Sequence, residues 1–151
     1  MTLNLDDRNT TWRLFLTAYS KLVDLIEQEL ALAELPPLMW YNVLVELSES
    51  PDHRLRMHEL ADIMVLDRSN LTRLVDRLEA KGLACRKFCP SDRRGAYAAI
   101  TEEGSSMRQK MWLVYEQAIA KYFGCHLSDQ EVAMFSKALK RMIAGTQERA
   151  S

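Results

Sequence analysis

The sequence predicts a mainly α-helical fold with one small β-hairpin, and three observations support this prediction. Apolar residues recur at spacings of three and four through most of the 151-residue chain, which is the periodicity of amphipathic helices. Between residues 83 and 100 the pattern changes to two short extended segments around a Pro-Ser-Asp-Arg-Arg-Gly turn. A hydrophobic fraction of 48% and a charged fraction of 27% are typical of a soluble globular protein, so we expect one domain over residues 1–151.

Two amphipathic helices are expected before residue 50. The first spans residues 8–33 and ends before Leu35-Pro36-Pro37, because consecutive prolines do not continue a helix. Its apolar stripe consists of Trp12, Phe15, Tyr19, Leu22, Val23, Ile26 and Leu30. The second helix ends near Ser50-Pro51, and its stripe consists of Trp40, Val43, Leu44 and Leu47. A short extended segment at residues 54–56 and a compact helix from Met57 to about Met64 follow.

The next predicted helix has the clearest boundaries in the chain. Asp67 is placed to cap its N-terminus, and Lys81 followed by Gly82 is a typical C-terminal sequence. Its buried face consists of Leu71, Leu74, Val75 and Leu78. At about 100° per residue, the opposite face contains Ser69, Arg73 and Asp76, flanked by Asn70, Arg77 and Thr72. This outward face is therefore rich in hydrogen-bond donors and cations.

The remainder of the chain is predicted as a hairpin and two long helices. Residues 83–88 and 96–100 are expected to pair as strands, Thr101 is expected to cap the next helix, and Ser128 to Glu131 form a capping box for the last one. A short helix, a tight turn, a second helix and a hairpin make a winged helix-turn-helix, here at about residues 38–101. The flanking helices, at about residues 8–33 and 105–148, carry more apolar surface than this small module can cover. We expect them to be dimerisation helices, with packing inside one chain as the alternative.

Charge is distributed unevenly along the sequence. The segment from Arg68 to Arg94 contains eight basic and three acidic residues, a net charge of +5, whereas the whole chain has a net charge of −1. A basic module on an acidic body is expected where one face meets a polyanion, although a solvated charged face would have the same composition.

Double-stranded DNA is the polyanion that this arrangement fits best. Side chains at the start of the outward helix face can reach base edges in a major groove, and arginines at the hairpin tip can lie over the backbone or in the minor groove. The predicted DNA-binding residues are Arg68, Ser69, Asn70, Thr72, Arg73, Arg77, Asp92, Arg93 and Arg94. Asp92 would orient one of the neighbouring arginines, while Arg77 could instead pair with Asp76 or with an acid of the wing. Lys81, Arg86 and Lys87 are interpreted as phosphate contacts or solubilising charges.

At these residues the sequence resembles the MarR family of bacterial transcription regulators. The resemblance covers nearly the whole chain and is most specific at residues 59–61, 71–79, 81–83, 91–94 and 100–104. It implies a homodimer with two winged modules on a pseudo-palindromic operator. It also implies regulation, by default repression, that a small phenolic or aromatic acid relieves. One departure is Val65, because many members have glycine in this turn.

Such an effector would bind between the dimerisation helices and the winged module. An apolar pocket could be lined by Trp12, Phe15, Tyr19, Trp40, Tyr41 and Leu44. The carboxylate of the effector could be met by Arg54, Arg56 or His58. Each of these residues is equally explained by packing inside the protein.

Other functions receive less support from the sequence. Cys85 and Cys89 could form a thiol-based redox sensor beside Arg86 and Lys87, and a winged helix that binds only protein is a third possibility. The three histidines are scattered, so no metal site and no cofactor are expected. No catalytic motif is recognisable, so the protein is not expected to be an enzyme. The odd cysteine count and the lack of a signal-like or membrane-spanning segment favour a cytoplasmic location.

Overall fold

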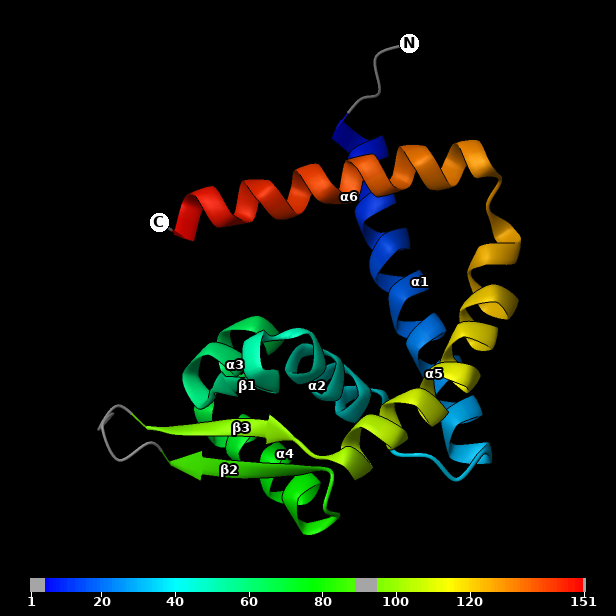
Figure 1. Ribbon diagram of the computed structural model, residues 1–151. Coiled ribbons are helices and arrows are strands. Elements are labelled where there is room, and N and C mark those ends of the chain that lie inside the picture. Colours follow the sequence, from blue (N-terminus) through cyan, green and yellow to red (C-terminus); the bar gives the residue numbers. More distant parts are fainter. Residues whose placement is uncertain (1–4, 89–94, 151) are drawn as a thin grey trace.

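The computed structural model describes residues 5–88 and 95–150 (Figure 1). Its helices are α1 (Leu5–Leu32), α2 (Leu38–Glu49), α3 (Met57–Met64), α4 (Arg68–Ala80), α5 (Glu102–Tyr122) and α6 (Asp129–Ala150). Its strands are β1 (Arg54–Arg56), β2 (Ala84–Phe88) and β3 (Ala96–Ile100), and two short 3-10 turns lie at Pro51–His53 and Gly124–His126. The predicted mainly α-helical fold with a small wing is confirmed, and α1 begins a few residues earlier than expected.

The wing is a three-stranded antiparallel sheet in the order β1-β3-β2. Leu55 of β1 lies opposite Ala98 of β3, which in turn lies opposite Arg86 of β2. Side chains on directly paired residues point to the same face of a sheet, so these three share the face that packs on the core. The extended segment expected at residues 54–56 is thus the third strand of the wing.

Two groups of buried side chains hold the chain together. The larger lies inside the winged module and consists of Val43, Leu44, Leu47, Leu60, Ala61, Leu71, Leu74, Val75, Leu78, Leu83, Ala84 and Ala98. The smaller joins α1, α2 and α5 and consists of Ile26, Leu30, Leu38, Met111 and Ala118. Because α5 follows β3 directly and also packs on α1, it connects the winged module to the long helices (Figure 1).

A very close contact occurs where α5 leaves the wing. A Cβ atom added to Gly104 would lie 2.0 Å from the carbonyl oxygen of Leu83. Thr101 caps α5 by accepting a hydrogen bond from the Gly104 amide at 3.0 Å, and its hydroxyl donates to the Gly82 carbonyl at 2.6 Å. The start of α5 is therefore fixed against the end of α4 and the start of β2.

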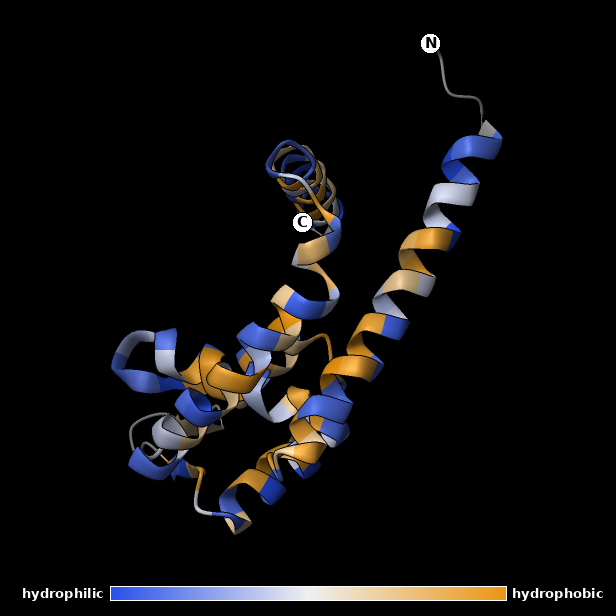
Figure 2. Cartoon of the chain, turned by 90° about the vertical axis from the view of Figure 1, so that its right-hand side faces the viewer, coloured by the Kyte–Doolittle hydropathy of each residue, from blue (hydrophilic) through white to orange (hydrophobic). Residues whose placement is uncertain are grey.

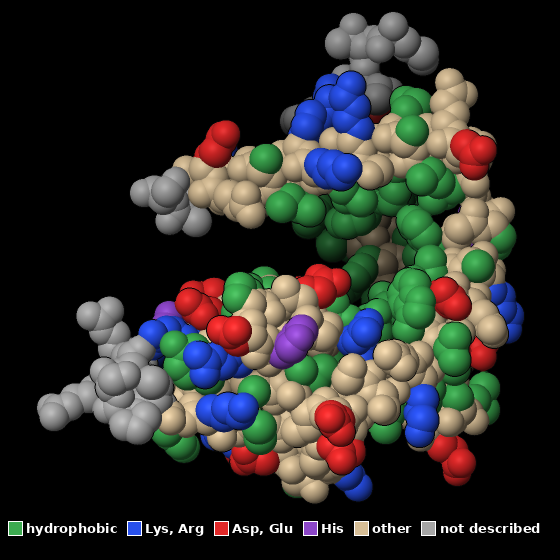
Figure 3. Space-filling model, viewed as in Figure 1, with side chains coloured by type: hydrophobic (Ala, Val, Ile, Leu, Met, Phe, Trp, Pro, Cys, Tyr) green, Lys and Arg blue, Asp and Glu red, His purple; other side chains and the backbone are tan. Residues whose placement is uncertain are grey.

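The long helices extend away from this core and carry exposed apolar side chains. The N-terminal half of α1 is hydrophobic on a surface that faces solvent, and α6 crosses α1 far from the winged module (Figures 1 and 2). Trp12 is 60% exposed, Tyr19 64% and Met142 62%. Hydrophobic side chains also line the hollow between α6 and the winged module (Figure 3). Among the described residues, no helix is both long and apolar enough to span a bilayer.

Candidate nucleic-acid interface

The turn between α3 and α4 is made without glycine. Val65 adopts a left-handed conformation with φ 54° and ψ 45°, and the amide of Leu66 donates to the carbonyl of Ala61 at 3.0 Å. This is the hydrogen-bonding pattern with which glycine commonly ends a helix. The turn therefore has the usual geometry, but a β-branched side chain that is 87% exposed occupies its strained position.

Asp67 organises the first turn of α4. One of its carboxylate oxygens accepts from the Asn70 amide at 2.7 Å and from the Ser69 hydroxyl at 2.8 Å, and the other accepts from the Asn70 side-chain amide at 2.7 Å. The hydrogen bond from the Asn70 backbone, with that from Ser69, holds the pKa of Asp67 below its ordinary value. The predicted N-cap is confirmed.

Arg73 extends this network along the outward face of α4. Its guanidinium donates to the side-chain oxygen of Asn70 at 3.2 Å and lies 3.5 Å from the Ser69 hydroxyl. Ser69, Asn70 and Arg73 are all exposed, while the other side of the helix is buried. The three side chains are therefore oriented before any ligand arrives.

The remaining predicted residues of α4 are exposed but differ in how they are held. The Thr72 hydroxyl donates its proton to the Arg68 carbonyl at 2.8 Å. Towards a ligand, Thr72 therefore presents its methyl group and a hydroxyl oxygen that can only accept a hydrogen bond. Arg68 lies at the N-terminus of the helix and Arg77 in its last turn, both with exposed side chains.

The wing tip carries the other predicted DNA-binding residues. Asp92, Arg93 and Arg94 lie outside the described residues, as does Cys89. The strands that lead to this segment are paired as far as Phe88 opposite Ala96.

Arg86 has a different role from the one interpreted from sequence. Its guanidinium forms ion pairs with Asp76 at 2.6 Å and with Glu79 at 3.1 Å, and it is within 3.3 Å of the Thr72 carbonyl. The interpretation of Arg86 as a phosphate contact or solubilising charge did not include these ion pairs, which already neutralise part of its charge inside the protein. Asp76 is paired with Arg86, and the ion pairs of the described residues include none between Arg77 and Asp76; a pair of Arg77 with an acid of the wing stays a prediction. Lys81 and Lys87 are exposed.

Comparison of the sequence and the structure with known proteins shows to which family this fold belongs. Residues 35–95 match the pattern of the MarR family. Over 106 residues, the chain is 37% identical to YxaD of Bacillus subtilis, an uncharacterized HTH-type transcriptional regulator, with 68% of this chain and 69% of that protein covered. The structure of the present chain aligns with that of Sco3205, a MarR family transcriptional regulator from Streptomyces coelicolor solved in complex with DNA. The TM-score is 0.84 and the sequence identity 30%, and the alignment covers 96% of this chain and 91% of Sco3205. The chain belongs to the MarR family.

Two further comparisons limit and extend this assignment. The chain spans 59–63% of the length of several curated relatives, all HTH-type transcriptional regulators. CouR from Rhodococcus jostii, solved with bound p-coumaroyl-CoA, aligns at a TM-score of 0.71 and 29% identity, covering 85% of this chain and 88% of that one.

The predicted effector site of this MarR protein is not assembled as expected. Leu44 is completely buried in the core of the winged module, and Trp40 packs against the same core. Trp12, Phe15 and Tyr19 lie on the exposed half of α1, where the Phe15 ring meets Phe135 of α6 at 6.5 Å. The prediction that all six apolar residues line one pocket was wrong for Leu44, because no surface of it is accessible.

Two of the predicted carboxylate partners, Arg54 and Arg56, lie together, and His58 lies elsewhere. Arg54 and Arg56 place their guanidinium groups over the Tyr97 ring, at 4.7 and 4.9 Å from its centre, and the three residues line a cavity on the outer face of the wing. His58 lines a different cavity, near Arg68 and the end of the hairpin. Neither cavity contains the aromatic residues of α1 or α2. The structure therefore brings none of the three into a cavity with the predicted aromatic residues, and a role for Arg54, Arg56 or His58 in binding a carboxylate stays a prediction.

An aromatic cluster that the sequence did not reveal lies between α2 and α5. The Tyr41 ring lies 6.2 Å from Trp112 and 5.2 Å from Tyr115, and Trp112 and Tyr115 meet edge to face at 5.9 Å. Burial raises the pKa of both tyrosines, so both are neutral phenols at ordinary pH. The signal in the sequence was present, since Trp112 and Tyr115 are three apart on α5, but only the fold brings them to Tyr41.

Arg108 lies beside this cluster. Its positive charge acts on the Tyr41 hydroxyl, opposing the effect of burial on the pKa. Its Nε atom is buried and has no hydrogen-bond partner among the described residues. Arg108 is thus placed to meet an acidic group beside Tyr41, whereas Arg54 and Arg56 lie over the Tyr97 ring of the wing.

The cysteines and possible metal ligands add little to the site. Cys85 is half-buried on β2 opposite Ala99, and Cys125 is exposed in the 3-10 turn that follows α5. In the described part of the chain, no three His, Cys, Asp or Glu side chains are grouped to hold a metal ion.

Proposed function

We propose that this protein is a sequence-specific DNA-binding transcription regulator that acts as a homodimer and releases its operator when a small aromatic acid binds. The outward face of α4 is the observation that carries this proposal. Exposed Ser69, Asn70 and Arg73 form one hydrogen-bonded row from the N-cap, on a helix whose other face is anchored in the core. Oriented donors of these kinds suit base edges in a major groove.

The family relationship supports the DNA partner. Sco3205, whose fold matches over nearly the whole chain, was solved in complex with DNA. Residues 92–94 would add wing contacts to the neighbouring backbone or minor groove, where negative potential favours arginine. Asp92, Arg93 and Arg94 are therefore proposed as DNA-binding residues on their sequence alone.

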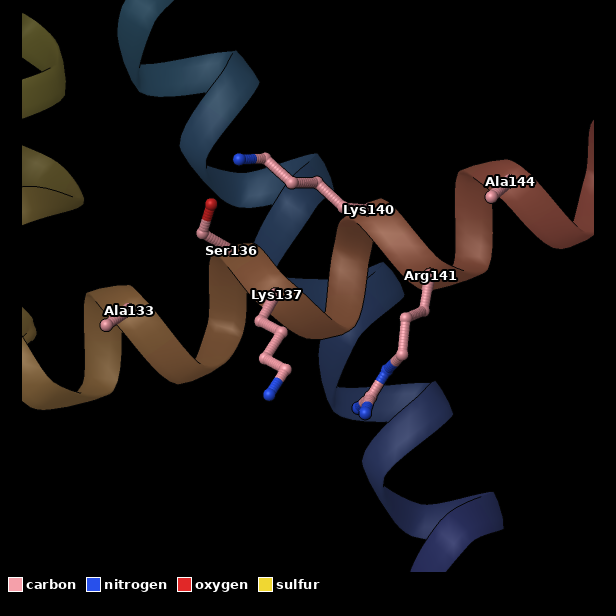
Figure 4. A pocket seen from close by; sticks show the side chains of 6 residues that line it. All are labelled: Ala133, Ser136, Lys137, Lys140, Arg141 and Ala144. Atoms are coloured by element: carbon pink, nitrogen blue, oxygen red, sulfur yellow. The ribbon is translucent and has the colours of Figure 1, made fainter.

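A second copy of the chain is the proposed cover for the long helices. The apolar surface on α1 and α6 includes Trp12, Tyr19, Met142 and Ile143, each more than half exposed. Figure 4 shows that α6 also has a basic surface with small side chains on either side of the cations, formed by Ala133, Ser136, Lys137, Lys140, Arg141 and Ala144. Small residues allow a helix to approach closely, and a twofold dimer would cover both surfaces at once. It would also place two α4 helices on a pseudo-palindromic operator, and binding there would repress by excluding polymerase.

The proposed effector site is the aromatic cluster of Tyr41, Trp112 and Tyr115 with Arg108. An aromatic acid would stack on these rings and present its carboxylate to the guanidinium of Arg108. CouR, which was solved with an aromatic acyl-CoA, shows that a protein of this fold accommodates an aromatic ligand. Since α5 connects this region directly to β3, a ligand here is placed to change the position of the winged module.

DNA binding is tested by fluorescence anisotropy with a duplex from the protein's own promoter and a random duplex of equal length. Wild type should bind the promoter duplex more tightly, and Arg73→Ala should lose about 1–3 kcal/mol on it with little change on random DNA. Lys110→Ala, which removes an exposed charge from α5, is the matched control. Equal losses on both duplexes would make Arg73 a phosphate contact, and no preference by wild type would contradict the proposal.

The effector is tested by adding 4-hydroxybenzoate or 4-hydroxycinnamate to the promoter complex, with hexanoate as a non-aromatic acid. The aromatic acids should release DNA and hexanoate should not. Arg108→Gln should keep operator affinity but require about tenfold more acid, because a charge-assisted hydrogen bond is removed. Release by all three acids, or an unchanged response in Arg108→Gln, would contradict this site.

A further inference from the structure

Arg86 joins the wing to one edge of α4. Its side chain is only 19% exposed, whereas its partners Asp76 and Glu79 are 57% and 42% exposed. Besides the two ion pairs, the backbone amide of Arg86 donates to the second carboxylate oxygen of Glu79 at 2.7 Å. One residue of β2 is thus attached to α4 through both its main chain and its side chain.

The acceptors follow the geometry of the helix. Thr72, Asp76 and Glu79 are separated by four and three residues, so they form one stripe within about 60° on the surface of α4. This stripe borders the outward face, because Asp76 lies one turn beyond Arg73 on the same side. The neighbours of Arg86 on β2, Cys85 and Lys87, point to the other face of the sheet. Arg86 is therefore the residue through which this part of β2 meets the stripe.

The two carboxylates would otherwise disfavour a polyanion. Asp76 and Glu79 lie where α4 would approach the phosphate backbone, and an unpaired carboxylate there would repel it. The ion pairs turn these acids toward the wing and neutralise part of their charge. They also fix the angle between α4 and the strands that carry residues 92–94.

We infer that Arg86 is a positioning residue for operator binding: it sets the wing against α4 and masks Asp76 and Glu79 without contacting DNA. This inference rests on the proposed function, since it assumes that α4 and the wing bind one duplex together. It goes beyond that function because it assigns to Arg86 the orientation of the wing against α4, and not a contact with a DNA phosphate.

The test uses variants that separate position from charge. Arg86→Gln/Glu79→Gln removes one positive and one negative charge, so the net charge of the protein is unchanged. Operator affinity is measured at several salt concentrations, at a temperature where circular dichroism shows the variant to be folded. Lys87→Gln, which removes a neighbouring cation from the opposite face of β2, is the control for simple loss of charge.

The double variant should bind the operator about tenfold more weakly, the effect of losing charge-assisted hydrogen bonds, with the same dependence of log K on log salt. The single variant Arg86→Lys should also bind the operator more weakly than wild type, although it keeps the positive charge, because an ammonium group lacks the planar fork that spans two carboxylates. A decrease in the salt slope of about 0.9 per protomer would instead make Arg86 a phosphate contact and overturn the inference. Unchanged affinity in Arg86→Gln/Glu79→Gln would also overturn it.

The same experiment distinguishes the two proposals. If wild type binds the operator and Arg73→Ala does not, while the Arg86 variants bind normally, only the inference about Arg86 fails. If wild type shows no operator preference, the proposed function fails and the role of Arg86 fails with it.

Discussion

Replacing Gly104 with alanine should destabilise the protein, although alanine favours helices and Gly104 lies in one. The added Cβ would lie 2.0 Å from the Leu83 carbonyl oxygen and 2.9 Å from Cγ1 of Ile100, so α5 would have to move away from β2. That movement would strain the contacts by which Thr101 binds the Gly82 carbonyl and caps α5.

The magnitude follows from three contributions. Overpacking of a closely packed site costs about 1–3 kcal/mol. Two weakened hydrogen bonds add about 1 kcal/mol each, and the higher helix propensity of alanine returns about 1 kcal/mol. We therefore expect Gly104→Ala to lower the free energy of unfolding by about 2–4 kcal/mol.

Urea unfolding at one fixed protein concentration measures this loss, because the stability of a dimer depends on concentration. Gly145→Ala is the matched control: it is the same substitution in α6, and beyond its own helix turn the Cβ would meet no atom of the described residues within 4 Å. Gly145→Ala should be neutral or stabilising by up to about 1 kcal/mol. Equal stability of the two variants would refute the reasoning from close approach.

Three further predictions concern the turn, the long helices and the wing. Val65→Gly should stabilise the protein by about 1 kcal/mol in thermal unfolding, since it removes a β-branched side chain from a left-handed conformation; no gain over Val65→Ala would contradict this. Hydrogen bonds from Lys121 and Tyr122 hold the pKa of Glu29 below its ordinary value of 4.5. The contribution of ionised Glu29 to the free energy of unfolding is therefore complete above pH 4.5 and is lost as the pH falls through the lowered pKa. Glu29→Gln should flatten that decrease in acid unfolding curves. Arg93→Ala/Arg94→Ala should weaken operator binding and reduce the salt slope by up to about 0.9 for each phosphate that the variant no longer binds; an unchanged slope would show an ordinary solvated turn.

Local signals in the sequence predicted the elements of the fold well. Asp67 accepts from the Asn70 amide as an N-cap does, and Gly82 takes the left-handed conformation expected after a helix, with φ 71°. Both features depend on residues within one turn of the chain. The geometry at Val65 was not predictable in this way, because the tertiary packing of α3 and α4 imposes a conformation that valine disfavours.

The errors arose where a function depends on contacts between distant elements. Arg86 was interpreted as a surface cation because its partners are seven and ten residues earlier and become neighbours only when β2 folds against α4. Arg108 was overlooked because Trp112 and Tyr115, which follow it on α5, form an aromatic cluster only when the fold brings Tyr41 of α2 against them. A basic residue in sequence shows that a charge is available, but only the fold shows whether the protein already uses it.

This distinction changes how the basic segment is understood. Of its eight cations, Arg86 is paired with Asp76 and Glu79, while Arg73 is held within the polar row that begins at Asp67. Asp76 and Glu79, two of the three acids that reduce the positive charge of the segment, are thus paired with the wing, away from the exposed side chains at the start of α4. Because Arg86 neutralises part of the charge of Asp76 and Glu79, the positive charge of α4 is concentrated on the part of the helix that would enter a DNA groove. Arg86 can have this effect without contacting DNA itself. Electrostatic attraction and the geometry of base recognition would then depend on different arginines, so salt dependence and operator preference should be separable by mutation.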